Sequence, residues 1–395
     1  MLLNQDRLTA HLQRENLAAI VASTPENVTY TSGFWAMTQW IRRGPQAYVI
    51  LPVPGQGEPV IITSTATLDL VADQRPWIDE VRRFGSFAVV ANARELDPTS
   101  LRHRDLHALP DDGDALSALA GALQRAGLAR ARIGVDEVGL MPGDWGRLQE
   151  RLPSATLVPA ASLLRQVRAV KTDEEIARLK TAAGIAERSI AAALSVARTG
   201  VSEIELARAF HAQTVLEDAV PVLGCIGSGP RSALMNVQPS ERALTSGDVL
   251  RFDVGGRYRH YRADIARIAT VGEPDGEIRR FHRALLAGVE HACEIIRPGM
   301  RASSVFEITV ETVRRAGIPD YARNHVGHGI GLDGYDLPDL SPGSSDLIEE
   351  GMVLCIETPH YDLGRWGLQV EDMVVVRAGG VESLMTTSGD ISVVG

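Results

Sequence analysis

Cysteine is scarce in this sequence of 395 residues. The three cysteines, Cys225, Cys293 and Cys355, lie far apart and form no CxxC pair. An odd number of cysteines without a regular spacing excludes a disulfide framework, because such a framework needs paired residues. We therefore expect three reduced residues in the core of a cytoplasmic protein.

Long apolar runs are absent as well. The first sixteen residues contain no apolar segment long enough for a signal peptide, and no later stretch approaches the roughly 20 apolar residues of a membrane helix. The sequence also lacks the GxGxxG and GxxxxGK patterns, so nucleotide binding is not indicated. There is no basic excess: the net charge is −10, which argues against nucleic acid or an anionic membrane as a partner.

The length predicts two domains, because one hydrophobic core rarely serves so many residues. The basic stretch RQVRAVK at 165–171 precedes a helix start, and we place the boundary there, giving domains 1–165 and 166–395. In the first domain short apolar runs alternate with helical segments, which predicts an α/β fold. The predicted strands are Leu17–Ser23, Gln46–Val53, Pro59–Ser64 and Ala131–Val135, and the predicted helix is Asp114–Ala126.

The second domain begins with two capping boxes, Thr172 with Glu175 and Ser202 with Glu205, each of which predicts a helix start. Strands rich in β-formers and further helices follow. The predicted segments are strands Asp248–Val254 and Arg262–Val271, helices Glu277–Ile296 and Ser304–Ala316, and strands Met352–Glu357, Gly367–Val376 and Val381–Ser388. Hairpins rather than βαβ units predict an α+β domain with a largely antiparallel sheet.

Four carboxylates interrupt strands that are otherwise apolar: Asp253, Asp264, Glu357 and Glu371. Buried carboxylates repel one another, so four together are tolerable only where cations neutralise them. His328 stands among glycines, which leave room for a rigid ligand. Carboxylates with one imidazole suit Mn²⁺, Co²⁺, Fe²⁺ or Zn²⁺. Single acidic residues in strands are more often salt-bridged, however, and periodicity alone cannot join these five.

The pieces GDVLRFDVGGRYRHYRADIARIATVGEP, HVGHGIGLDGYDLPDL, GMVLCIETPHY and GLQVEDMVVV place the five residues at spacings of 11, 64, 29 and 14. These pieces resemble the creatinase, prolidase, aminopeptidase P and methionine aminopeptidase superfamily, and the layout is similar to that of compact prolidases. The segment ENLAAIVASTPENVTYTSGFW resembles the N-terminal domain of creatinases, which methionine aminopeptidases lack. The resemblance implies a pita-bread fold for the second domain.

The resemblance also implies roles for the five residues. Asp253 matches a ligand of one metal ion, Asp264 and Glu371 match bridging carboxylates, and His328 and Glu357 match ligands of a second ion. Glu357 also matches the general base toward the attacking water. The implied cofactor is two divalent ions, with Mn²⁺ preferred over Co²⁺, Fe²⁺ or Zn²⁺.

The residues expected around the metals depart from the family pattern. Asn236 and Tyr335 stand where the peptidases usually hold histidines, and Gln369 stands where aminopeptidase P has an arginine, whereas Tyr361 is kept. Asparagine cannot change charge, and a tyrosine has a reference pKa near 10, so neither shuttles protons at neutral pH as histidine does. These changes put ordinary Xaa-Pro peptidase activity in doubt.

Nearby side chains are candidates to replace the missing histidines. His325 precedes the ligand histidine by three residues, and His360 lies between Glu357 and Tyr361. Structural histidines are the alternative for both. The aromatic and basic loop Gly33–Arg43 contains Trp35, which could line a substrate site in a creatinase-like homodimer; ordinary packing is the alternative for this tryptophan.

Three functions remain open from sequence. The first is a dinuclear metallohydrolase that cleaves an amide bond in Xaa-Pro dipeptides or peptides. The second is a repurposed member that acts on a small non-peptide metabolite, such as an amidino or ring hydrolase or a lyase. The third is a binding module without catalysis, which is disfavoured because all five ligand positions are filled.

Overall fold

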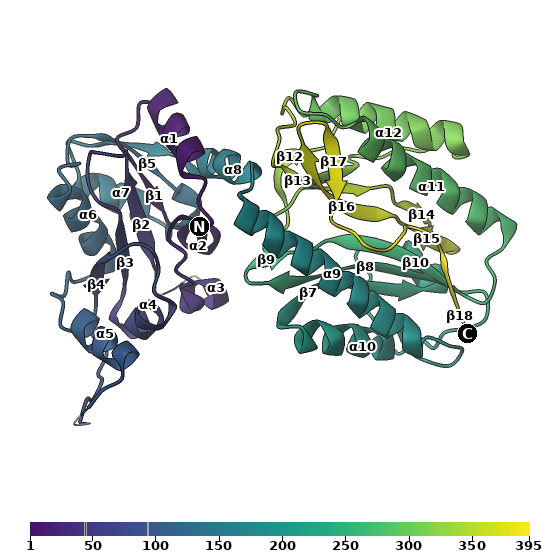
Figure 1. Ribbon diagram of the computed structural model, residues 1–395, viewed down its shortest axis with the longest axis horizontal. Coiled ribbons are helices and arrows are strands. Elements are labelled where there is room, and N and C mark those ends of the chain that lie inside the picture. Colours follow the sequence, from purple (N-terminus) through teal and green to yellow (C-terminus); the bar gives the residue numbers. More distant parts are fainter. Residues whose placement is uncertain (43, 45, 93–94) are drawn as a thin grey trace. The chain divides into compact units, whose positions relative to one another are not determined.

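Short runs of Val, Ile and Ala build the central sheet of the N-terminal unit, Met1–Val167, in the computed structural model, which describes residues 1–42, 44, 46–92 and 95–395 (Figure 1). The sheet order is β4-β3-β2-β1-β5-β6. Its strands are β1 Ala19–Ala22, β2 Tyr48–Pro52, β3 Val60–Ser64, β4 Glu80–Phe84, β5 Arg132–Val135 and β6 Thr156–Pro159. β2 is antiparallel to both of its neighbours, and the other pairs are parallel.

Helices cover this sheet, as expected of an α/β domain. They are α1 Gln5–Arg14, α2 Pro25–Ser32, α3 Met37–Arg42, α4 Leu68–Gln74, α5 Pro98–His107, α6 Ala115–Arg125, α7 Asp144–Arg151 and α8 Ala161–Ala169. α6 packs its apolar face on β3 and β4. The predicted strands therefore contain β1, β2, β3 and β5, and the predicted helix contains α6.

The C-terminal unit, Arg168–Gly395, contains two pairs of helices, each followed by strands of one ten-stranded sheet. The helices are α9 Asp173–Val196, α10 Glu203–Leu216, α11 Gly276–Ile295 and α12 Ala302–Ala316. Both predicted capping boxes form, at Thr172 and at Ser202. α9 and α10 pack on β7 and β8, whereas α11 packs on β13, β16 and β17 (Figure 1).

The sheet of this unit follows the order β12-β11-β13-β16-β10-β8-β7. The strands are β7 Ala219–Ser228, β8 Val249–Tyr258, β9 Tyr261–Arg262, β10 Ile265–Val271, β11 Gly327–Gly329, β12 Asp336–Asp339, β13 Val353–Glu357, β16 Glu371–Arg377, β17 Gly380–Ser383 and β18 Ser392–Val394. All pairs are antiparallel except β10 with β18. None of the described helices is long and apolar enough to cross a bilayer.

One predicted strand, Gly367–Val376, is interrupted. β15, Trp366–Leu368, pairs with β14, His360–Asp362, in a separate ribbon, and β16 begins only at Glu371. The chain changes partners at Gln369 and Val370, because β16 must pair with β13 and β10 instead. The break leaves Gln369 and Glu371 beside the carboxylates described next.

Candidate metal centre

Strand register brings three of the predicted acidic residues into one row. Asp253 on β8 lies opposite Ala266 on β10, Ala266 lies opposite Glu371 on β16, and Glu371 lies opposite Glu357 on β13. Residues directly opposite each other in antiparallel strands point to the same face of the sheet. The three side chains therefore share one face, although 118 residues separate Asp253 from Glu371.

Asp264 and His328 join the row from its sides. Asp264 lies just before β10, two residues from Ala266, rather than within the predicted strand. His328 on β11 lies opposite Cys355, which is two residues before Glu357 on β13. Because strand side chains alternate with period two, both positions face the same side as the row.

Two triads of potential ligand atoms result, and Glu371 belongs to both. One comprises Asp253, Asp264 and Glu371, and the other comprises His328, Cys355 and Glu371; within each triad the ligand atoms lie within 4.8 Å of one another. His328 Nε2 also lies 3.9 Å from Asp264 Oδ2. A shared carboxylate between two triads is the arrangement that a pair of neighbouring metal ions requires.

Glycines on both sides of His328 allow this approach. Gly327 has a φ of 141°, and a Cβ there would lie 2.0 Å from the carbonyl oxygen of Cys355. A Cβ on Gly329 would lie 2.1 Å from the carbonyl oxygen of Leu337. His328 Nδ1 lies 3.0 Å from the Gly329 carbonyl, so this nitrogen carries the proton and Nε2 keeps its lone pair toward the carboxylates.

The electrostatics of the cluster favour cations. Burial, followed by repulsion from neighbouring carboxylates, raises the pKa of Asp264 and of Glu371 well above its ordinary value. Burial also raises the pKa of Glu357 to about 7 and lowers the pKa of His328 to about 4. Within the described chain, Asp264 Oδ1 and Glu371 Oε1 are buried without a hydrogen-bond partner. Unpaired buried carboxylate oxygens and a neutral imidazole fit divalent ions.

Arg251 is a residue of this site that the sequence analysis missed. Its guanidinium is fully buried and donates to Asp253 Oδ2 at 3.1 Å and to Gln369 Oε1 at 2.8 Å. It also donates to the carbonyls of Ser232, Leu234 and Met235, which are 16 to 19 positions earlier in the chain. The sequence feature that could have indicated Arg251 is its position two residues before Asp253 on one strand, because side chains two positions apart on a strand lie on the same face.

Gln369 connects the carboxylates on the other side of the cluster. Its amide nitrogen lies 3.4 Å from Glu357 Oε2 and 3.3 Å from Glu371 Oε2. Its carbonyl oxygen accepts from Arg251 and, at 3.4 Å, from the Tyr361 hydroxyl. A neutral amide at this position therefore holds two of the candidate ligands in place without adding charge.

Two more predicted residues lie beside the cluster. The Tyr335 ring stacks on His328 with a centroid distance of 4.0 Å, and its side chain is exposed. His325 Nδ1 lies 3.2 Å from Glu357 Oε1. Arg323, which was not predicted, places Nη2 4.0 Å from Glu357 Oε2 and lies over the Tyr361 ring. Glu357 is thus approached by an imidazole and a guanidinium.

For the remaining predicted residues, the contacts described here are with groups other than the carboxylate cluster. Asn236 is exposed in the turn that follows the Arg251-bound carbonyls. The His360 ring packs against Phe281, 5.1 Å away between centroids, and against Trp366. Trp35 belongs to the N-terminal unit, where its backbone exchanges hydrogen bonds with the Gln74 side chain. Arg43, at the end of the predicted loop, lies outside the described residues.

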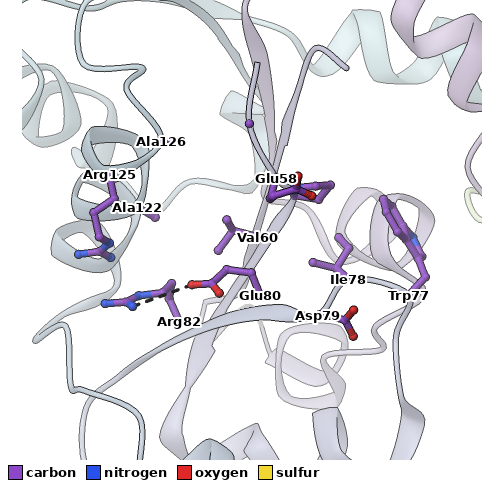
Figure 2. Close-up of a pocket in the computed structure, with 12 residues that line it drawn as sticks. Glu58, Val60, Trp77, Ile78, Asp79, Glu80, Arg82, Ala122, Arg125 and Ala126 are labelled. Atoms are coloured by element: carbon purple, nitrogen blue, oxygen red, sulfur yellow. Dashed lines mark ion pairs between the residues drawn. The ribbon is translucent and has the colours of Figure 1, made fainter. Parts of the chain in front are cut away.

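A pocket of about 730 Å³ lies in the N-terminal unit, and it contains none of the predicted site residues (Figure 2). Its wall includes Glu58, Trp77, Asp79 and Glu80. Arg82 lies 4.0 Å from Glu80 and 2.8 Å from Asp112, so its charge is already balanced within the protein. The pocket offers no unpaired buried charge comparable with the carboxylate cluster.

Two sequence-family models match the chain. That of metallopeptidase family M24 matches residues 177–378, and that of the creatinase/prolidase N-terminal domain matches residues 5–170. The chain is 31% identical to the Xaa-Pro dipeptidase of Pyrococcus furiosus over 231 residues, which cover 58% of this chain and 66% of that protein, slightly less than two thirds of its length.

Solved structures cover nearly the whole chain. The X-Pro aminopeptidase of Thermotoga maritima superposes with a TM-score of 0.79 at 24% identity, over 98% of this chain and 100% of that one. The dipeptidase PepE of Mycobacterium ulcerans superposes with a TM-score of 0.76 at 26% identity, over 99% and 96%. These matches confirm the predicted resemblance and the pairing of an α/β domain with a pita-bread domain.

Proposed function

Because this chain belongs to metallopeptidase family M24, we propose that it uses two divalent ions to hydrolyse the amide bond before proline in dipeptides or short peptides. Family membership makes the chain a metal-dependent hydrolase of the peptidase class. One observation carries the two-ion proposal: Glu371 belongs to both triads of potential ligands. A small non-peptide substrate, the alternative from sequence, is not favoured by relatives that are peptidases.

The proposed ligands divide between the two ions. Asp253, Asp264 and Glu371 would hold one ion, and His328, Glu357 and the two shared carboxylates Asp264 and Glu371 would hold the other. Ions bound there would polarise the substrate carbonyl and lower the pKa of the attacking water. The raised pKa values of the buried carboxylates support this division, because cations relieve the repulsion between them.

Proton transfer is assigned to Glu357. Its carboxylate, with a pKa raised by burial to about 7, can take a proton from the attacking water and return it to the departing nitrogen near neutral pH. His325, 3.2 Å away, would orient this carboxylate. The leaving proline nitrogen needs that proton because it departs as a secondary amine.

Two tyrosines would supply hydroxyl donors beside the metals: Tyr335, which stands where the peptidases usually hold a histidine, and Tyr361, which the family pattern keeps. The Tyr335 hydroxyl, on a ring stacked against His328, can donate to the developing oxyanion, and the Tyr361 hydroxyl can do so when it turns away from its weak bond of 3.4 Å to the Gln369 carbonyl oxygen. Loss of one such donor typically lowers the rate by about 10²–10³-fold. Asn236 and His360 are proposed as contacts for the substrate at the edge of the site.

Manganese is the proposed ion, because oxygen ligands with one imidazole suit Mn²⁺ and burial keeps the Cys355 thiol protonated through a raised pKa. We also propose a cytoplasmic homodimer. The three cysteines of the described structure are free thiols, which is consistent with a reducing compartment.

The test compares substrates with and without metal. The purified chain, loaded with Mn²⁺ after chelation, is assayed on Xaa-Pro dipeptides, on Xaa-Ala dipeptides, on longer peptides with proline second, and on small amidino and cyclic amide metabolites. Selective release of proline that disappears on chelation supports the proposal. Turnover of a metabolite without turnover of any peptide would overturn it.

A further inference from the structure

Tyr335, the proposed donor to the oxyanion, is the last residue of the loop 330–335 that joins β11 to β12. Tyr335 is 55% exposed, so the stacking of its ring on His328 restrains it only in part. The next residue, Asp336, begins β12, lies opposite Gly329 and is 1% exposed. The position of the Tyr335 hydroxyl therefore depends on how the buried Asp336 is held.

Two cations hold the Asp336 carboxylate, one at each oxygen. Arg168 Nη2 donates to Oδ1 at 2.8 Å, and Lys171 Nζ lies 3.6 Å from Oδ2. Both cationic side chains are buried, at 3% exposure for Arg168 and 0% for Lys171. Contacts at both oxygens fix the rotation of the carboxylate as well as its position, and so they fix the backbone at the end of the loop.

The other end of the loop approaches the same charges. A Cβ on Gly331 would lie 2.6 Å from Asp336 Oδ2 and 3.3 Å from Lys171 Cε. The Gly331 amide donates to the Asp333 carbonyl at 3.0 Å, and the Gly331 carbonyl accepts from the Arg262 amide at 2.9 Å. Both ends of the loop therefore lie against one buried ion pair, and glycine is the residue that permits so close an approach.

Stability alone does not explain these buried charges. Burial of an ion pair costs desolvation free energy that the attraction between its members often only offsets, so apolar residues of the same volume are commonly as stable. The contacts also join segments that are far apart in sequence, because Arg168 and Lys171 precede α9 at the start of the C-terminal unit, and Arg168 is 168 positions from Asp336. What the cations add is a defined geometry at Asp336, one residue from Tyr335.

We propose that Arg168 and Lys171 are positioning residues, which act through Asp336 to place the Tyr335 hydroxyl where it donates to the oxyanion. The inference rests on the function proposed above, in which Tyr335 is such a donor. A group displaced by about 1 Å from its place in the reaction can lower the rate about 10²-fold. Loss of one of the two cations should therefore reduce kcat, although neither cation touches the substrate.

The experiment is a double-mutant cycle in kcat for the dipeptide Leu-Pro, with the full chain loaded with Mn²⁺. It compares the wild type with Arg168→Gln, with Tyr335→Phe and with the double variant, and Arg168→Lys tests rescue by a conservative change. The control is Arg242→Gln, which removes a guanidinium that donates to another buried aspartate, Asp248, at 2.6 Å and 2.9 Å. If Arg168→Gln does not fold, Lys171→Met replaces it in the cycle.

Arg168→Gln should lower kcat about 10–100-fold with little change in KM, because the donor acts on charge that develops in the transition state. In the Tyr335→Phe background the same change should cause no further loss, and Arg168→Lys should restore part of the rate. Arg242→Gln should keep the wild-type kcat. In the metal-free protein, hydrogen exchange of residues 330–336 should be faster in Arg168→Gln than in the wild type or in Arg242→Gln.

Circular dichroism and metal content verify that each variant folds and holds its ions. The positioning role is overturned by equal losses from Arg168→Gln in the two backgrounds, by an unchanged kcat in Arg168→Gln or in Tyr335→Phe, or by unchanged hydrogen exchange of the loop. Each of these results leaves the peptidase proposal standing. Absence of Leu-Pro hydrolysis by the wild type overturns both proposals.

Discussion

At the scale of single residues, the proposed ligands differ in how many of the two ions each of them would hold. Glu371 belongs to both triads, whereas Asp253 belongs to one. We expect Glu371→Gln to reduce the metal content from two ions per chain to none, and Asp253→Asn to reduce it to one. Elemental analysis after loading with Mn²⁺ and gel filtration measures both values. Two retained ions in Glu371→Gln would exclude the shared carboxylate.

His282 provides a pH prediction away from the carboxylates. It is 3% exposed on α11, and burial lowers its pKa to about 4. In the unfolded chain the histidine has a pKa near 6.5 and therefore takes up a proton more readily than His282 does in the folded protein. The contribution of neutral His282 to the free energy of unfolding is thus fully present above pH 6.5 and is lost as the pH falls toward 4. The loss is about 3 kcal/mol at most.

Urea unfolding between pH 4 and pH 7 measures this effect. His282→Gln should unfold with a shallower pH dependence than the wild type, while the other titrating groups contribute equally to both proteins. If the free energy of unfolding depended on pH in the same way in both proteins, the fold would not be keeping His282 neutral.

At the scale of elements, the short strand β11 depends on a glycine that no other residue can replace. Gly327→Ala would place a Cβ 2.0 Å from the Cys355 carbonyl at a φ of 141°. We expect a loss of at least about 3 kcal/mol in unfolding free energy, together with weaker metal binding through displacement of His328. Gly334→Ala is the control, because its nearest neighbour, the Arg262 side chain, is 3.7 Å away. Similar midpoints in urea for both variants would contradict the prediction.

Elements with local signals were predictable from sequence. The capping boxes at Thr172 and Ser202 fix the starts of α9 and α10 through residues three positions apart. By contrast, β11 and β12 are short and contain glycines or proline, so they carry no alternating pattern. The break at Gln369 was also missed, because a change of strand partner leaves no trace in hydrophobicity.

The residues of the candidate site also divide into those that could be predicted from sequence and those that could not. The five proposed ligands could be grouped only through the resemblance to a family, because their spacings span 118 residues. Arg251 and Arg323 were missed because the groups that they contact are distant in sequence. Tertiary contacts, not composition, identify the arginines that belong to the site.

At the scale of the whole molecule, metal binding should stabilise one unit and not the other. Within the described residues, groups of three or more potential ligands occur only in the C-terminal unit. A ligand at 100 times its dissociation constant adds about 2.7 kcal/mol per site. Hydrogen exchange with Mn²⁺ or with a chelator should therefore differ for peptides from β8, β13 and β16 but not for peptides from β1, β2 and β3. Equal changes in both units would contradict a site confined to residues 168–395.

The position of β16 has a consequence for how the protein matures. This strand lies between β13 and β10 and joins the half of the sheet that contains His328 to the half that contains Asp253. With the ligands proposed above, a nascent chain could not bind both ions until nearly all of the C-terminal unit has been synthesised and β16 has inserted. On that proposal, metal binding would be a late event that distinguishes completely folded molecules from misassembled ones, and a chain whose sheet is incomplete would have no hydrolytic activity.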